Sequence, residues 1–147
     1  MPSYGRTSRS RLESCHEDLQ AIFNAVILEA DCSILCGERS QEAQTLAFDL
    51  GNSRVQWPDS LHNKKPSMAV DVALYHKDIE GHIDWNNKQE FCDFSELVRK
   101  VADDLLWAGQ ISHKLRWGGD WDGDGVPVFM DDDESLWDAP HYELEEE

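Results

Sequence analysis

The chain has 147 residues, a length that suits one domain with a single hydrophobic core. Hydrophobic residues make up 40% of the sequence, which argues against a disordered chain. The formal net charge of −17 argues against nucleic acids and anionic membranes as partners, because phosphate groups bind to basic surfaces.

The first residues of the chain, Met1 to Arg6, lack the apolar core of a secretory signal. No apolar run approaches the roughly 18 residues that span a bilayer. We therefore expect a protein that is made and folded in the cytoplasm, without membrane insertion. The four cysteines contain no CxxC pair, so we expect reduced thiols and not a thiolate zinc site.

Apolar residues at intervals of three and four predict an amphipathic helix from Leu12 to about Glu29. Residues 32–36 have the composition of a short strand, which ends at Gly37. A second helix is expected between Ser40, which can cap its first turn, and Gly51, which suits a left-handed position after its last turn.

Residues 52–66 show no periodicity and predict a long loop, of the kind that often carries function. Residues 68–75 resemble a strand with Asp71 inside it, and a carboxylate there needs a partner because burying it alone is costly. A third helix is expected from Phe91 to Trp107, with short strands at 114–117 and 140–144. This order predicts a small single α+β domain with a short antiparallel sheet and about three helices.

Three side chains that can bind metal stand out: His62 in the long loop, Asp71 in the strand and His141 near the end of the chain. Three protein ligands with a fourth position open are typical of a catalytic zinc site. Zinc at such a site lowers the pKa of its water towards about 7 and polarises a scissile carbonyl. Spacing alone leaves open that these are ordinary surface or core residues.

The surrounding residues resemble the motifs of the LAS metallopeptidases, a group named for lysostaphin-like enzymes, D-Ala-D-Ala metallopeptidases and sonic hedgehog. The similar segments occur in the order of the family and extend from about Leu12 to Leu144, nearly the whole chain. They are Gly-Glu-Arg-Ser at 37–40, Gln44, Gly-Asn-Ser at 51–53, Ser-Leu-His at 60–62, Ala-Val-Asp at 69–71, Leu-Arg-Trp-Gly-Gly-Asp-Trp at 115–121 and Asp-Ala-Pro-His at 138–141. The segment 115–121 resembles a block of the phage-type endolysins.

This resemblance implies that His62, Asp71 and His141 hold a zinc ion. It also implies that Asp138 is the catalytic acid and base, taking a proton from the attacking water and delivering it to the leaving amine. His62 and Asp71 are nine positions apart, two more than is common in the family. The extra residues fall within 63–67, a loop where insertions are tolerated.

The resemblance further implies a substrate-binding role for three residues. Arg39 matches an arginine that faces the substrate and stabilises negative charge as it develops, which makes it a second catalytic candidate. Gln44 and Ser60 match positions that shape or line the same site.

A separate acidic motif, Asp-Trp-Asp-Gly-Asp-Gly at 120–125, resembles the first half of an EF-hand calcium loop. Asp120, Asp122 and Asp124 supply oxygens at positions 1, 3 and 5, and Asp131 stands at position 12. Carboxylate oxygens suit calcium and leave zinc to the imidazoles. The alternative is an acidic turn that binds no metal.

Together these features predict a zinc-dependent phage-type endolysin that cleaves the L-alanyl-D-glutamate bond of the peptidoglycan stem peptide as a monomer. The expected organisation is a mobile segment at 1–10, the peptidase domain at 11–144 and an acidic tail at 145–147. The enzyme would reach the cell wall from the host cytoplasm through a holin or after lysis. Two alternatives stay open: a D-alanyl-D-alanine carboxypeptidase or dipeptidase, and a non-catalytic calcium-binding virion or interaction module of the same fold.

Overall fold

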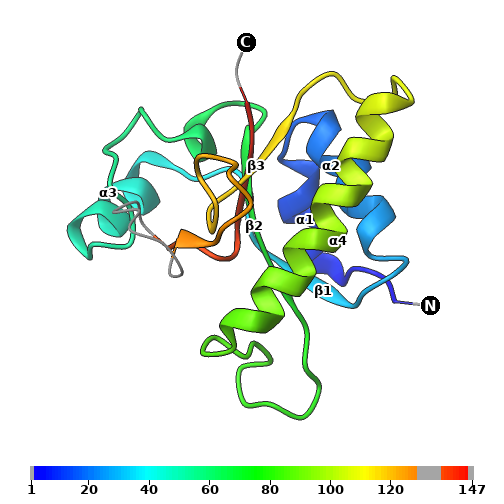
Figure 1. Cartoon of the computed structure of the whole chain (residues 1–147). Helices are drawn as coiled ribbons and strands as arrows, with labels where there is room; N and C mark the ends of the chain where they lie inside the picture. The colour runs from blue at the N-terminus through cyan, green and yellow to red at the C-terminus, as the bar shows by residue number, and fades with distance from the viewer. Residues whose placement is uncertain (1, 129–136, 146–147) are drawn as a thin grey trace.

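An antiparallel sheet runs through the middle of the fold (Figure 1). Its strands are β1 (Cys32–Cys36), β2 (Ala69–Leu74), β3 (Leu115–Trp117) and β4 (His141–Leu144), in the spatial order β1-β2-β4-β3. This computed structural model describes residues 2–128 and 137–145. The expected α+β class and antiparallel sheet are confirmed.

Helices cover the sheet unequally on its two sides. Helices α1 (Arg6–Glu13), α2 (Glu17–Val26) and α4 (Lys88–Trp107) lie on one side, and α3 (Gln41–Asp49) lies on the other (Figure 1). A single 3₁₀ turn, η1 (Leu61–Asn63), interrupts the long loop before β2. Within the described ranges, no helix is both long and apolar enough to cross a membrane.

The single helix predicted from Leu12 to Glu29 is wrong, because the chain bends between α1 and α2. At the bend, Cys15 forms an isolated bridge with Ser67. His16 then caps α2, because its Nδ1 accepts a hydrogen bond of 3.0 Å from the N–H of Asp18. Buried apolar residues of both helices belong to the same core. Their spacing of three and four therefore continues across the bend, and the sequence pattern does not reveal where the first helix ends.

The segment expected to be mobile, residues 1–10, contains the start of α1 at Arg6. Tyr4 is buried in the core, and its hydroxyl donates a hydrogen bond of 2.7 Å to the carbonyl oxygen of Phe23. Polar and basic composition suggested a segment without tertiary contacts, whereas one aromatic residue is enough to attach it to α2.

The other predicted elements are present, with shifted ends. Ser40 caps α3 by accepting from the N–H of Ala43, and Gly51 follows the helix with φ 79°, as expected. Helix α4 begins at Lys88, earlier than predicted, because the side chain of Asn87 caps it.

Strand periodicity separates a buried face of the sheet from a polar one. On β4, Tyr142 and Leu144 are fully buried, and Tyr142 makes edge-to-face contacts with Phe23 of α2 and Phe94 of α4. The intervening residues of β4 therefore point to the opposite face. That face, on the side of α3, carries the polar side chains described next.

Candidate active site and metal centre

Two of the predicted zinc ligands lie opposite each other on neighbouring strands. Asp71 of β2 and His141 of β4 are paired in the antiparallel register, which places both side chains on the same face of the sheet. The register of β1 shifts between Ile34 and Cys36, a bulge that brings Cys36 opposite Asp71. The structure thus brings residues 70 positions apart in sequence into direct contact.

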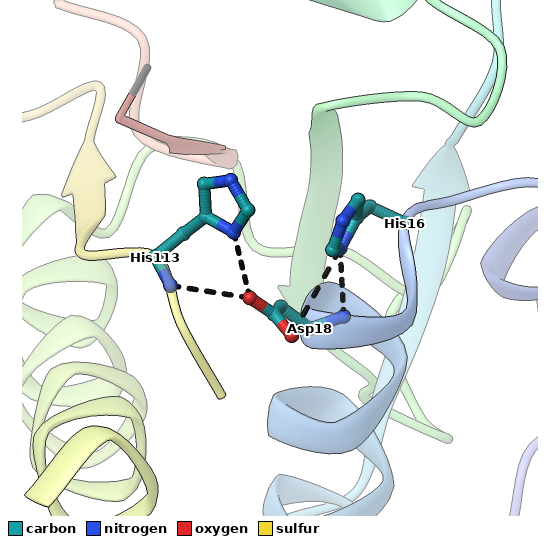
Figure 2. Close-up of side chains that lie close together, drawn as sticks. All are labelled: His16, Asp18 and His113. Carbon is teal, nitrogen blue, oxygen red and sulfur yellow. Dashed lines mark hydrogen bonds and ion pairs between the residues drawn. The ribbon is translucent and has the colours of Figure 1, made fainter. Parts of the chain in front are cut away.

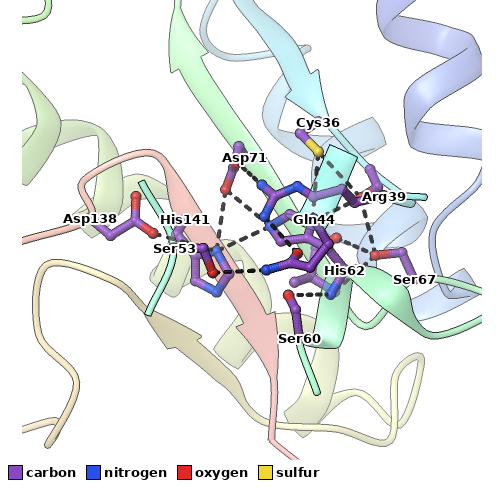
Figure 3. Close-up of polar contacts among 12 residues, drawn as sticks. Cys36, Arg39, Gln44, Ser53, Ser60, His62, Ser67, Asp71, Asp138 and His141 are labelled. Carbon is purple, nitrogen blue, oxygen red and sulfur yellow. Dashed lines mark hydrogen bonds and ion pairs between the residues drawn. The ribbon is translucent and has the colours of Figure 1, made fainter. Parts of the chain in front are cut away.

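The third predicted ligand, His62, comes from η1. The Ser60 hydroxyl caps this turn by accepting from the N–H of His62, and the Asn63 side chain accepts in return from the N–H of Ser60. The N–H of Arg39 also donates to the carbonyl oxygen of His62, at 2.7 Å. These local bonds fix a loop turn that would otherwise be free to vary, and they direct the imidazole onto the sheet (Figure 3).

The three side chains present their donor atoms in a nearly equilateral triangle (Figure 3). Nε2 of His62 lies 3.3 Å from Nδ1 of His141 and 3.4 Å from Oδ1 of Asp71, and the last two atoms are 3.2 Å apart. Ligand atoms of a tetrahedral zinc ion, with bonds of about 2.0–2.1 Å, are about 3.3 Å from one another. The residues present therefore fit a zinc ion, with one coordination position left over.

Further hydrogen bonds orient both imidazoles through the ring nitrogens that point away from the triangle. Nδ1 of His62 lies 2.8 Å from the carbonyl oxygen of Gly37, and Nε2 of His141 lies 2.8 Å from Oε1 of Glu143. Because these oxygens accept, each of the two nitrogens carries hydrogen, and the opposite nitrogen faces the triangle. Such partners of metal-bound histidines fix the ring and raise its basicity. The sequence did not assign a role to Gly37 or Glu143.

Asp71 controls the protonation of both imidazoles. Burial lowers the pKa of His62 and His141, but hydrogen bonds with the Asp71 carboxylate outweigh it and raise both pKa values above the usual range. Burial raises the pKa of Asp71, yet its bonds to the two histidines hold it well below its usual value. A divalent cation would replace the proton on the nitrogen of each ring that faces the triangle, because zinc binds the neutral imidazole.

Asp138 lies beside the triangle, with Oδ2 3.9 Å from Nδ1 of His141. Burial and the charge of Asp71 raise the pKa of Asp138 to about 6. A carboxyl group with a pKa near neutrality is suited to take up and release a proton. The structure thus places Asp138 beside the three candidate ligands, and its acid and base role stays a prediction.

Strand β3 holds the segment that carries Asp138. The N–H of Asp138 donates to the carbonyl oxygen of Gly118 at 2.9 Å, and the Trp117 indole donates to the carbonyl oxygen of Ala139 at 2.7 Å. A Cβ atom at Gly118 would collide with the carbonyl oxygen of Asp138. Only glycine at residue 118 allows the two segments to approach this closely.

Arg39 and Gln44 form a polar layer at the side of the triangle. Nη2 of Arg39 lies 3.6 Å from Oδ2 of Asp71, and its Nη1 donates to Oε1 of Gln44 at 3.0 Å. Gln44 is fully buried and donates to the Ser53 hydroxyl and the Val55 carbonyl oxygen. Gln44 thus shapes the site by tying Arg39 to the loop after α3.

A cavity of about 1010 Å³ opens over these groups. His62, Asp71, Asp138 and His141 line it together with Arg39, and Ser60 lies at its wall. Its apolar wall includes four aromatic side chains, Trp85, Phe91, Trp121 and Trp137. The ring of Trp121 lies 5.4 Å from the ring of His141. A cavity with a polar centre and an aromatic wall is typical of a binding site for an organic substrate.

Cys36 also approaches the site, although the sequence suggested no thiolate ligand. Its Sγ lies 3.9 Å from Nδ1 of His62, on the side of the ring turned away from His141. Together with His62 and Asp71 it forms a group that could hold a metal. The triangle with His141 has the shorter separations, and both imidazoles face it.

The acidic motif forms a loop after β3, and its Trp121 lies against His141 of the candidate zinc ligands. Carboxylate oxygens of Asp120, Asp122 and Asp124 lie within 4.8 Å of one another. The N–H of Gly125 donates to Oδ2 of Asp120 at 3.0 Å. Oδ1 of Asp120 is buried and has no hydrogen-bond partner among the described residues. The fourth predicted ligand, Asp131, lies outside the described residues.

The fold and the site define a small α+β protein with a histidine–aspartate centre at the bottom of a cavity. The model of the phage L-alanyl-D-glutamate peptidase family matches residues 2–145, so the chain belongs to this family. The crystal structure of the Serratia marcescens L-Ala D-Glu endopeptidase ChiX has the same fold, with a TM-score of 0.69 at 22% sequence identity. The match covers 97% of this chain and 90% of that one. No curated protein sequence matches the chain.

Proposed function

We propose that this peptidase is a zinc-dependent endolysin that hydrolyses the L-alanyl-D-glutamate bond of the peptidoglycan stem peptide. The family supports a peptidase for this bond. The observation that supports zinc is the triangle of His62, Asp71 and His141 donor atoms, 3.2 to 3.4 Å apart. Zinc held there would supply Lewis acidity, which polarises the scissile carbonyl and acidifies a water molecule.

The chain's own groups would carry the proton transfers. Asp138 faces the same cavity as the three ligands and would accept a proton from the attacking water. It would then donate that proton to the nitrogen of the departing D-glutamyl residue. Arg39, held by Gln44 and Asp71, would face the carbonyl oxygen as its negative charge grows.

Replacing Asp138 tests this assignment most directly. Asp138→Asn keeps the shape of the side chain and removes its basicity, so we expect a fall in kcat of at least about 100-fold with zinc still bound. His62→Ala should instead lose zinc together with activity. Asp59→Asn is the matched control, because Asp59 is an exposed carboxylate at the wall of the same cavity. Full activity in Asp138→Asn would refute the proposed role.

The bond that is cleaved separates this function from a D-alanyl-D-alanine carboxypeptidase or dipeptidase. Purified peptidoglycan digested by the enzyme should gain new amino termini on D-glutamate, identified by mass spectrometry. Release of free D-alanine without new D-glutamate amino termini would favour the carboxypeptidase. Release of neither product from a protein with bound calcium would favour a non-catalytic module.

We also propose that calcium binds to the loop at 120–124. The carboxylate of Asp120 supports it: Oδ2 lies 3.6 Å from Nη1 of Arg99, whereas Oδ1 is buried without a hydrogen-bond partner among the described residues, a cost that a bound cation would offset. Burial and the nearby carboxylates raise the pKa of Asp120. Calcium should raise Tm of the wild type, and Asp122→Asn with Asp124→Asn should abolish that rise. An equal rise in the double variant would contradict the site.

A cell-wall substrate requires the enzyme to leave the cytoplasm of the host in which it is made. We propose that it acts after a holin opens the membrane or after lysis. Expression of the chain alone should therefore leave host cells intact. Permeabilising the inner membrane should then start wall degradation, and lysis without permeabilisation would contradict this route.

A further inference from the structure

Figure 2 shows a second cluster of side chains that could hold a metal ion, His16, Asp18 and His113, and none of them lines the cavity. His16 and Asp18 belong to the start of α2, and His113 belongs to the segment just before β3. Leu115 of β3 pairs with Leu144, the last residue of β4, whereas His141 is the first residue of that strand. The cluster and the proposed zinc site are therefore near opposite ends of β4 and share no residue.

The side chains of the cluster converge from segments that are remote in sequence. Nδ1 of His113 lies 2.8 Å from Oδ2 of Asp18, and Nδ1 of His16 lies 4.0 Å from Oδ1 of the same carboxylate. The two imidazole rings meet edge to face, with centroids 4.9 Å apart. Each of the three residues offers one ligand atom, and these three atoms lie within 4.8 Å of one another. Small side-chain rotations would bring them to the separations of a zinc site.

Backbone groups fix the carboxylate of Asp18 in advance. Its Oδ2 accepts from the N–H groups of Ser112 and His113, at 3.0 and 3.2 Å, and from the hydroxyl of Ser112. Asp18 is 4% exposed, so this carboxylate is held in place and Oδ1 is turned towards His16. Such hydrogen bonds behind a carboxylate are what orients a metal ligand.

The two histidines are open enough for an ion to reach them. Their side chains are 22% and 23% exposed, compared with 6% for Asp18. Nδ1 of His16 accepts the N–H of Asp18, so its lone pair is engaged in the helix cap and becomes a metal ligand only when that hydrogen bond opens. Zinc would replace the proton between His113 and Asp18. Two imidazoles and one carboxylate favour zinc over calcium or magnesium.

We propose that His16, Asp18 and His113 form a second zinc site, completed by water, that joins the start of α2 to the segment before β3. The role of this site is structural, because its residues do not line the cavity. Binding draws His16 away from the N–H that it caps, so this site has lower affinity than the first. An ion that binds only the folded chain raises Tm.

Zinc counting on the whole chain tests the proposal independently of peptidase activity. Metal-free protein is equilibrated with increasing zinc, in excess calcium that competes for carboxylate oxygens elsewhere, and bound zinc is measured by mass spectrometry. We expect two equivalents for the wild type and one for His16→Asn. Asparagine caps helices well, so this variant removes the imidazole and keeps the cap of α2.

The second equivalent should raise Tm of the wild type by about 5–10 °C at zinc 100-fold above its Kd, and this rise should be absent from His16→Asn. His113→Asn should behave like His16→Asn, because it removes the other imidazole. His82→Asn is the matched control, since His82 lies outside the cluster and has φ 67°, a conformation that asparagine tolerates. It should bind two equivalents. The same zinc count in the wild type and in both cluster variants would overturn the proposal, whatever that count is. Loss of peptidase activity with the zinc count unchanged would bear only on the proposed function.

Discussion

Each histidine of the candidate zinc site has a different partner on each ring nitrogen. His62 turns Nε2 to the other ligands and Nδ1 to the Gly37 carbonyl, whereas His141 turns Nδ1 to the ligands and Nε2 to Glu143. The partner behind His62 is neutral and the partner behind His141 is charged. The ligand strength of His141 therefore depends on a side chain that mutation can change without touching the triangle.

Glu143→Gln should weaken zinc binding by about 10-fold to 100-fold, the usual cost of losing a partner behind a metal ligand. The amide oxygen still accepts from Nε2 of His141, so the ring keeps its place, but the negative charge behind it is gone. Zinc affinity measured by chelator competition tests the effect, and activity should recover at high zinc concentration.

Glu145→Gln is the matched control for this change. Glu143 and Glu145 both pair with Arg116, at 3.4 and 3.6 Å, but only Glu143 contacts His141. The control should therefore bind zinc like the wild type. If zinc binding is weakened equally in both variants, the cause is the lost pairing with Arg116 or the change in net charge, and not the contact with His141.

The hydroxyl of Tyr142 makes a second residue-scale prediction. Tyr142 is fully buried, and its Oη has no hydrogen-bond partner among the described residues. Tyr142→Phe should therefore leave the free energy of unfolding unchanged or raise it by about 1 kcal/mol. Tyr4→Phe removes a hydroxyl that donates to Phe23 and should lower it by about 1–2 kcal/mol. Urea unfolding measures both, and a similar loss in the two variants would show that Tyr142 has a partner.

The three candidate ligands could be chosen from the sequence, but the groups that hydrogen-bond to their outer nitrogens could not. Asp71 stands out as a carboxylate within an apolar strand, and the motif around His141 is specific. Glu143 falls in the predicted strand at 140–144, which places it on the same face as His141. The hydrogen bond between its carboxylate and Nε2 of His141 follows only from the structure.

At the scale of elements, the sequence predicted the four strands of the described residues but missed the bend between α1 and α2 and the first turns of α1. Each strand lies within its predicted range or differs from it by one residue, because strand residues and turn residues alternate clearly along the chain. The bend at 14–16 could not be predicted, since histidine is an unusual cap and the apolar spacing continues across it. The same bend places His16 beside His113, so the missed feature created the second cluster.

Close packing of β3 against the segment before β4 makes Gly118 a sensitive position. In Gly118→Ala, the added Cβ collides with the backbone of Asp138 and approaches the Cβ of His141. We expect kcat/KM to fall at least about 10-fold, with a loss of about 1–3 kcal/mol in stability from overpacking. Gly5→Ala is the control, because a Cβ there has no neighbour within 4 Å among the described residues. Wild-type kinetics in Gly118→Ala would contradict the close approach.

At the scale of the whole molecule, acidic residues outnumber basic ones, and the cavity is lined by Asp59, Asp71, Asp138 and Glu143 as well as by Arg39 and Arg54. The chain has 30 acidic and 13 basic residues, yet the polar layer beside the triangle is built on Arg39. Peptidoglycan stem peptides carry carboxylates of their own. Long-range repulsion therefore opposes the approach of this protein to its proposed substrate, while the local charge at Arg39 favours an anionic ligand once it is bound.

Salt should consequently increase activity on intact cell walls. The screening length falls from about 30 Å at 0.01 M to about 8 Å at 0.15 M, so repulsion between protein and wall is largely removed over this range while contacts inside the cavity remain. We expect KM on purified sacculi to fall several-fold with kcat nearly constant. A small soluble muropeptide, which carries few charges, should show a much weaker dependence. A fall in activity with salt on sacculi would instead indicate attraction, through a basic surface that opposes the net charge.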